Sequence, residues 1–121
     1  MTRTNRFLAT FVAAAVVPAA LLAADLPTGE WTGTVTPPEG TATPATFTVG
    51  QADGQTAISV SVMGLNLEFR EIEITDDGLA FTWTPGPDVR CQLELQDDST
   101  YSGPCTDTEG GTGHITMVPP G

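Results

Sequence analysis

Two cysteines carry the most specific chemistry in this sequence, because thiols that face each other across a hairpin form a disulfide in an oxidising compartment. Cys91 and Cys105 lie in residues 89–106, VRCQLELQDDSTYSGPCT, where apolar and polar residues alternate before an Asp-rich turn. Folding this stretch as a β-hairpin sets Leu95 opposite Tyr101 and Cys91 opposite Cys105. The sequence therefore predicts a Cys91–Cys105 disulfide.

The remaining reactive side chains form no catalytic pattern. His114, the single histidine, falls on the outward face of an expected strand, and no serine or threonine lies at motif spacing from it. The sequence contains no Cys/His metal motif and no phosphate-binding loop. Carboxylates such as Glu68 and Glu94 fall on outward positions. Exposure to water explains their presence there better than a role as a pair of general acid and general base. We therefore predict a protein that is not an enzyme and uses no cofactor.

Five aspartates fall in turns that are expected at one end of the domain, and carboxylate oxygens in flexible loops are ligands for hard cations. No EF-hand spacing accompanies them, and three solvated Asp-rich turns are the ordinary explanation. We therefore predict no metal site and keep weak Ca²⁺ binding by this cluster as an alternative. The five residues are Asp53, Asp76, Asp77, Asp97 and Asp98.

The charge of the chain excludes two classes of partner. The formal net charge is −11, and lysine is absent. Such a chain does not bind nucleic acid through phosphate, and an anionic membrane surface repels it. Solubility is the ordinary explanation of the charge, and a basic protein partner or a cation is the alternative.

The elements that position these side chains are short strands, because apolar residues alternate with polar ones between Pro/Gly-rich breaks. One run breaks the alternation: Leu67 and Phe69 share one phase, whereas Ile72 and Ile74 share the other. A strand cannot bury both sets on one face, so a bulge or bend is expected near Arg70. Strands are expected at residues 29–35, 46–49, 57–63, 65–74, 79–83 and 114–118, and in both arms of the cysteine hairpin.

These eight consecutive strands predict an all-β fold, a small antiparallel up-and-down β-barrel. Pairing the first strand with the last removes the exposed edges that an open sheet would leave. A two-sheet β-sandwich is the alternative. A barrel of this size is either filled by side chains or holds one small ligand. The residues expected to line its interior are Trp31, Phe47, Val60, Val62, Phe81, Trp83, Leu93, Tyr101 and Met117.

Residues 1–24 have the composition of a secretory signal peptide. Arg3 and Arg6 precede an uncharged apolar run, residues 7–24, which ends in small residues. An uncleaved membrane anchor is the alternative. We therefore expect residues 25–121 to form one exported domain, periplasmic or extracellular, with no membrane attachment after cleavage.

Residues 29–33, Gly-Glu-Trp-Thr-Gly, resemble the G-x-W opening of lipocalins and the wider calycin group. The Asp77-Gly78 turn, the aromatic strand at 79–83 and residues 101–103 are also similar to small exported bacterial lipocalin-like domains. The resemblance implies that Trp31 packs across the closed end of the barrel. It also implies that the end with the longer connections is the mouth. Those connections are residues 36–45, 64–66, 84–88 and 106–113.

Two functions remain for such a domain. The first is an exported, non-enzymatic module that holds a small hydrophobic molecule in its apolar barrel. The second is a filled-core structural domain whose acidic surface binds an envelope protein or Ca²⁺. The sequence assigns no oligomeric state.

Overall fold

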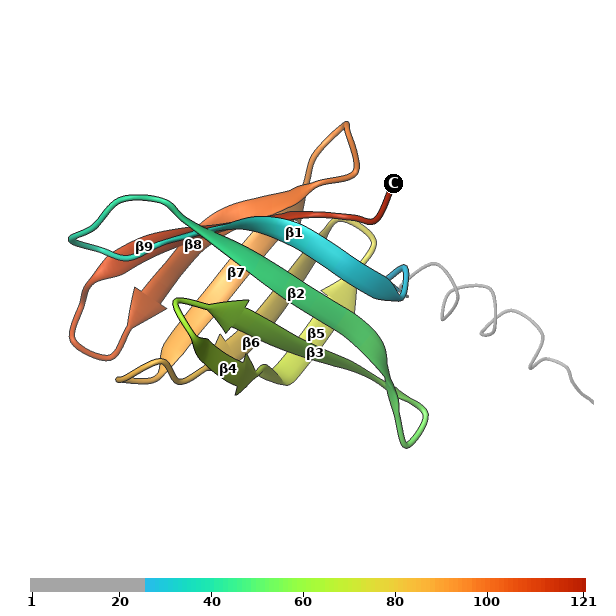
Figure 1. The fold of residues 1–121 in the computed structure, drawn as a ribbon, viewed down its shortest axis with the longest axis horizontal. Helices are drawn as coiled ribbons and strands as arrows, with labels where there is room; N and C mark the ends of the chain where they lie inside the picture. Colours follow the sequence, from blue (N-terminus) through green and yellow to red (C-terminus); the bar gives the residue numbers. More distant parts are fainter. Residues whose placement is uncertain (1–25) are drawn as a thin grey trace, which may run out of the picture.

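The computed structural model of the chain describes residues 26–121, and all its regular elements are β-strands (Figure 1). The predicted signal peptide lies outside the described residues. Residues 26–121 contain no helix long and apolar enough to cross a membrane. The strands are β1 (Gly29–Thr36), β2 (Thr43–Ala52), β3 (Gln55–Val62), β4 (Leu65–Glu68), β5 (Arg70–Thr75), β6 (Gly78–Trp83), β7 (Val89–Leu95), β8 (Tyr101–Asp107) and β9 (Thr112–Val118).

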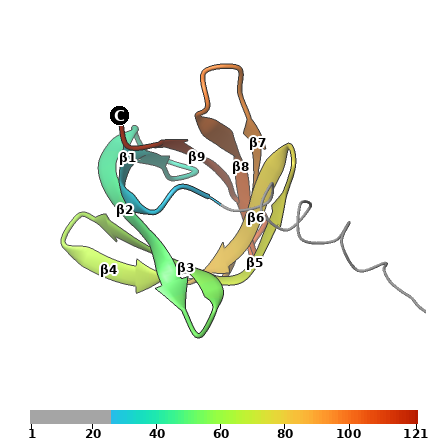
Figure 2. The same cartoon turned by 90° about the vertical axis from the view of Figure 1, so that its right-hand side faces the viewer.

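The strands form one antiparallel sheet that curls into a nearly closed barrel. Its order is β4-β3-β2-β1-β9-β8-β7-β6-β5. The first strand pairs with the last, from Thr32 opposite Val118 to Thr36 opposite His114. Figure 2 shows the strands arranged around a central interior. The predicted barrel and its β1–β9 closure are therefore confirmed, and the sandwich alternative is not adopted.

The expected count of eight strands is wrong by one, because the run at residues 65–74 turns a corner. β4 pairs with β3 and β5 pairs with β6, so the seam of the barrel lies between β4 and β5. Phe69 sits between the two strands, and its backbone N–H donates to Ile58 O at 2.9 Å. The single expected strand is thus two edge strands, which meet at one buried phenylalanine.

The predicted bulge near Arg70 is confirmed. The register of β5 against β6 shifts between Arg70 and Glu73, and Glu71 has a φ of 54°. That φ is costly for a non-glycine residue and persists only where neighbours fix it. Thr82 Oγ1 donates to Glu71 Oε1 at 2.8 Å, and Arg90 Nη1 donates to Glu71 O at 3.0 Å. The bulge changes the phase of the chain, so that residues on both sides of it face the core.

The hairpin of β7 and β8 has the predicted register. Leu95 lies opposite Tyr101 and Cys91 opposite Cys105. The two cysteines form a disulfide with an Sγ–Sγ distance of 2.08 Å, and the described residues contain no free cysteine. This bond joins neighbouring strands on the inner face of the barrel, where both cysteines are buried.

The connection between β1 and β2 is shorter than expected, because β2 begins at Thr43 rather than at Thr46. Pro44 lies inside this strand, opposite Thr34 of β1. Proline has no backbone N–H to donate to a neighbouring strand, and the pairing of β2 with β3 starts only at Thr46. Pro44 therefore occupies a part of β2 that is paired on one side alone.

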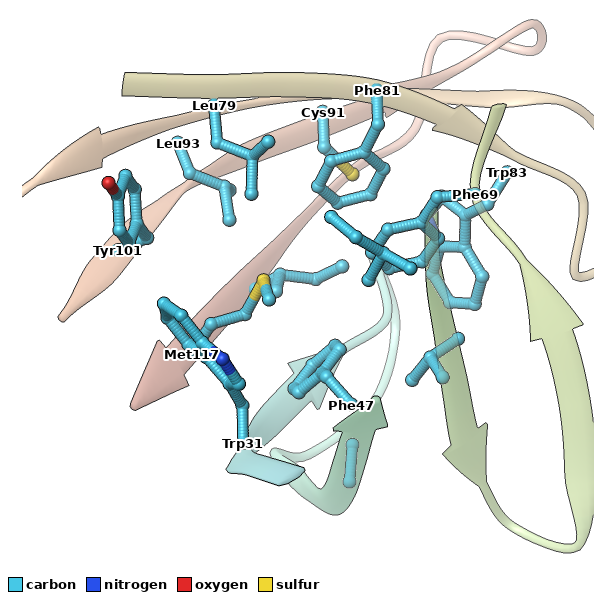
Figure 3. Packing of buried hydrophobic residues seen from close by; sticks show 14 of the residues in the cluster. Trp31, Phe47, Phe69, Leu79, Phe81, Trp83, Cys91, Leu93, Tyr101 and Met117 are labelled. Carbon is cyan, nitrogen blue, oxygen red and sulfur yellow. The ribbon is translucent and has the colours of Figure 1, made fainter. Parts of the chain in front are cut away.

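The interior is dominated by aromatic side chains that contact one another (Figure 3). Phe69 stacks on Phe81, with ring centroids 3.8 Å apart and planes 6° apart. It also lies 6.2 Å from Phe47 and 5.9 Å from Trp83, measured between ring centroids. Phe69 thereby joins the aromatic rings from both sides of the seam into one cluster.

Gly33 is expected to be intolerant of a side chain, because β1 approaches β9 closely where the barrel closes. A Cβ atom at Gly33 would collide with the backbone carbonyl oxygen of Thr116. We expect Gly33→Ala to lower the free energy of unfolding by about 1–3 kcal/mol, the usual cost of overpacking. Urea denaturation monitored by circular dichroism measures the change.

Gly50→Ala is the matched control, since Gly50 lies in β2 and its added Cβ would have no atom within 4 Å. Its effect should stay within about 0.5 kcal/mol. Equal stabilities of the two variants would show that β1 and β9 do not approach each other this closely.

Candidate functional site

A small apolar pocket lies at one end of the barrel, among the connections at residues 37–42, 63–64, 84–88 and 108–111. Its volume is about 180 Å³. This is the end that the lipocalin resemblance designates as the mouth. Most residues of its wall belong to one of these connections or to the adjoining end of a strand, and Ile115 comes from the middle of β9. The wall residues are Val35, Thr36, Pro37, Pro38, Thr43, Val62, Met63, Leu65, Trp83, Pro85, Val89, Cys105, Asp107, Gly111, Gly113, His114 and Ile115.

The pocket has a buried floor and an exposed apolar rim. Val62, Trp83 and Ile115 are at most 7% exposed and come from three different strands. Met63, in the tight β3–β4 turn, and Leu65, at the start of β4, are 79% and 48% exposed. The pocket is therefore open to solvent on the side where its rim is most apolar.

The structure buries all nine predicted interior residues but brings only two of them, Val62 and Trp83, to the pocket. The other seven are at most 8% exposed and pack against one another below it (Figure 3). These side chains fill the part of the barrel that lies below the pocket. The seven are Trp31, Phe47, Val60, Phe81, Leu93, Tyr101 and Met117.

Sequence reasoning missed the part of the site that the connections supply. Pro37, Pro38 and Pro85 form walls of the pocket, and Met63 and Leu65 form its rim. The sequence did contain a signal for these residues, because apolar residues within expected turns lie on neither face of a strand. The alternation of strand residues could not show that these turns come together around one pocket.

The opposite end of the barrel is sealed by Trp31. Its side chain is fully buried, and its Nε1–H donates to Pro27 O at 2.9 Å. The ring of Tyr101 lies 5.9 Å from it, and burial raises the pKa of the Tyr101 hydroxyl. Leu26, just before β1, is 4% exposed. A ligand would therefore reach the interior from the other end.

The Asp-rich turns lie at this sealed end, but the structure does not assemble them into a metal centre. In residues 26–121, no three His, Cys, Asp or Glu side chains come together in a way that could hold a metal ion. Asp98 Oδ1 accepts from Thr100 Oγ1 at 2.6 Å and from Thr100 N at 3.1 Å, which lowers the pKa of Asp98. Asp77 Oδ1 accepts from Thr75 Oγ1 at 3.0 Å. These two carboxylates therefore bond within their own turns. Among the described residues, Asp53, Asp76 and Asp97 belong to no group of three side chains that could hold a metal ion.

Two carboxylates shape the loops around the pocket. Asp107 Oδ1 accepts from the backbone N–H groups of Glu109 and Gly111, both at 2.8 Å, and so fixes the β8–β9 connection. Asp88 Oδ1 accepts from Thr84 Oγ1 at 2.8 Å and from Arg70 Nη2 at 2.9 Å. The Thr84 hydroxyl and the Arg70 guanidinium lower the pKa of Asp88. These contacts tie the β6–β7 connection, which carries Pro85, to the edge strand β5.

His114 has one side-chain neighbour within hydrogen-bond distance in the described residues, Ser102. The residue borders the pocket, but it is exposed, and its Nε2 lies 3.2 Å from Ser102 Oγ of β8. In residues 26–121, no third side chain forms a hydrogen bond with this histidine.

Comparison with known proteins adds no family. No protein-family model matches the chain, and no curated protein sequence matches it. Among solved structures, the chain is similar to a redesigned β-barrel, with 15% sequence identity and a TM-score of 0.49. The similarity covers 84% of this chain and 96% of that one. The site is therefore interpreted from its own geometry.

Proposed function

We propose that this domain is an exported, lipocalin-like binding module that holds a small hydrophobic molecule in the mouth pocket. One observation carries the proposal: the apolar pocket of about 180 Å³ above a filled barrel. An engineered apolar cavity of about 150 Å³ stays dry and binds benzene. A pocket of this size therefore suits a molecule of one or two rings rather than a long-chain lipid.

The exposed rim supports the same proposal. Exposed apolar residues that gather around a hollow mark binding sites more often than isolated ones do. Met63 and Leu65 are two of the four exposed large hydrophobic residues in residues 26–121, and both adjoin the pocket. A bound molecule would remove part of this rim from water, which adds to the affinity.

The proposed location, periplasmic or extracellular, rests on two features. Residues 1–24 have the composition of a signal peptide. The Cys91–Cys105 disulfide is consistent with an oxidising compartment, where such bonds persist.

Titration of the ¹⁵N-labelled domain with naphthalene, followed by ¹H–¹⁵N correlation spectra, tests the proposal. We expect saturable shifts at Val62, Trp83 and Ile115, and none at Trp31. Val35→Phe should abolish them, because Val35 is a partly exposed wall residue and the added ring would occupy the pocket.

The matched control is Val118→Phe, which adds the same ring at an exposed position near the sealed end of β9. It should bind naphthalene like the wild type. If wild-type shifts do not saturate, or if they spread over the outer surface, the binding proposal is wrong. The predicted alternative, a filled-core domain that acts through its acidic surface, would then take its place.

A further inference from the structure

The wall of the mouth pocket includes one acidic residue, Asp107, at the end of β8. Its Oδ1 accepts from the backbone N–H groups of Glu109 and Gly111, whereas its Oδ2 accepts no hydrogen bond within residues 26–121. Asp107 is half-buried, yet Oδ2 is not closed off from solvent, since Trp83 Nε1 alone is both buried and unpaired among the side chains of these residues. A donor that arrives with a ligand can therefore reach Asp107 Oδ2.

This carboxylate oxygen lies beside the apolar part of the same wall. A Cβ atom built at Gly111 would lie 2.7 Å from Asp107 Oδ2 and 3.0 Å from Pro38 Cγ. All three residues line the pocket, so the carboxylate oxygen and the proline ring flank one position on its wall. A hydrophobic molecule that packs on Pro38 would thus have the carboxylate at its edge.

The charges at this end of the barrel favour a positive group on the ligand. No arginine or lysine of the described residues lines the pocket, and the formal net charge of the chain is −11. Glu39 and Glu109 are exposed in the β1–β2 and β8–β9 connections. Arg70, beside the β6–β7 connection, forms an ion pair with Asp88 at 2.9 Å. A ligand anion would therefore meet Asp107 without gaining a free counter-charge.

His114 is the one lining residue in the described part of the chain that can become positively charged. Its Nε2 lies 3.2 Å from Ser102 Oγ. Ser102 stands between the buried Tyr101 and Gly103 of β8, so its side chain faces the outside of the barrel. This ring nitrogen is thus engaged outside the pocket, and Asp107 is the charged group that a ligand would meet in the wall.

We propose that the pocket prefers hydrophobic cations, molecules of one or two rings that carry an ammonium group, with the ammonium against Asp107 Oδ2. This inference rests on the proposed function and names the class of ligand for the same pocket. The apolar walls supply most of the affinity, and the carboxylate selects the charge through a charge-assisted hydrogen bond.

Three naphthalene derivatives of similar shape test the inference: 2-naphthylmethylammonium as the cation, 2-naphthylmethanol as the neutral molecule, and 2-naphthoate as the anion. Each is titrated at neutral pH into the ¹⁵N-labelled, oxidised domain, and the affinity is read from the shifts of Val62 and Ile115. The cation should bind about fivefold tighter than the alcohol, as one partly exposed ion pair predicts. It should also move the Gly111 N–H resonance more than the alcohol does, because that N–H bonds to Asp107.

Asp107→Asn tests the assigned contact, because it removes the charge and keeps an oxygen that can accept from the N–H groups of Glu109 and Gly111. The ratio of the cation and alcohol affinities should fall at least about threefold. Asp98→Asn is the matched control. It changes the net charge equally at the sealed end, keeps an acceptor for Thr100, and should leave the ratio unchanged.

Equal affinities of the cation and the alcohol for the wild type would overturn the inference while the pocket still binds the alcohol. An equal loss of the preference in both variants would also overturn it, because the attraction would then come from the net charge rather than from Asp107. Tighter binding of 2-naphthoate than of the alcohol would overturn the charge preference as well. Failure of both the alcohol and the cation to bind would instead overturn the proposed function.

Discussion

Phe69→Ala is expected to lower the free energy of unfolding by about 3–5 kcal/mol, the usual cost of truncating a buried phenylalanine. Phe69 is 6% exposed and lies where β4 ends and β5 begins, at the seam of the barrel. Its ring stacks on Phe81 of β6, across from the rings of Phe47 and Trp83. Backbone pairing does not close the seam, so side-chain packing has to hold it.

The measurement is chemical denaturation, followed by far-UV and near-UV circular dichroism. Leu65→Ala is the control in the adjoining strand β4, where Leu65 is 48% exposed, and it should cost less than about 1 kcal/mol. If Phe69→Ala fails to fold, Phe69→Leu keeps the test open: it should retain part of the stability and lose the near-UV signal of the stacked rings. A loss below 1 kcal/mol for Phe69→Ala would show that this ring does not seal the barrel.

Removing the disulfide should lower the free energy of unfolding by about 3 kcal/mol. Cys91 and Cys105 are separated by 14 positions in sequence, and a bridge over a loop of about 15 residues stabilises mainly by restricting the unfolded chain. The double variant Cys91→Ala/Cys105→Ala removes the bridge without leaving a free thiol. Its denaturation midpoint is compared with that of the oxidised wild type.

The wild type with its disulfide reduced is the control, and it should unfold close to the midpoint of the double variant. Peptide mapping of the non-reduced wild type should recover one linked pair that contains both cysteines. Equal midpoints for oxidised and reduced protein, or two thiols that alkylate without reduction, would contradict the prediction.

Local alternation in the sequence was enough to predict most of the strands and their closure into a barrel, but not the division of residues 65–74 into two edge strands. Side chains in a strand alternate between two faces, so Cys91 and Cys105 could be placed opposite each other from the spacing about their turn. The reversal of phase between Phe69 and Ile72 likewise required a bulge, because one strand cannot bury both on one face. These features depend only on neighbouring residues and on the need to cover exposed edges.

Only the tertiary structure decided where the interior is filled and where it is open. Alternation assigns a residue to the inner face but does not say how far along the barrel it lies. Trp31 and Trp83 share that face, yet one seals the closed end and the other lines the pocket.

The stagger of the strands and the convergence of four connections set those positions, through contacts between segments distant in sequence. Within residues 26–121, the same contacts pair the Trp31 indole N–H with Pro27 O and leave the Trp83 indole N–H without an acceptor. A donor is satisfied or not only by what folding brings within hydrogen-bond distance of it. The sequence therefore determined the barrel and its disulfide, whereas the three-dimensional packing decided where the pocket lies.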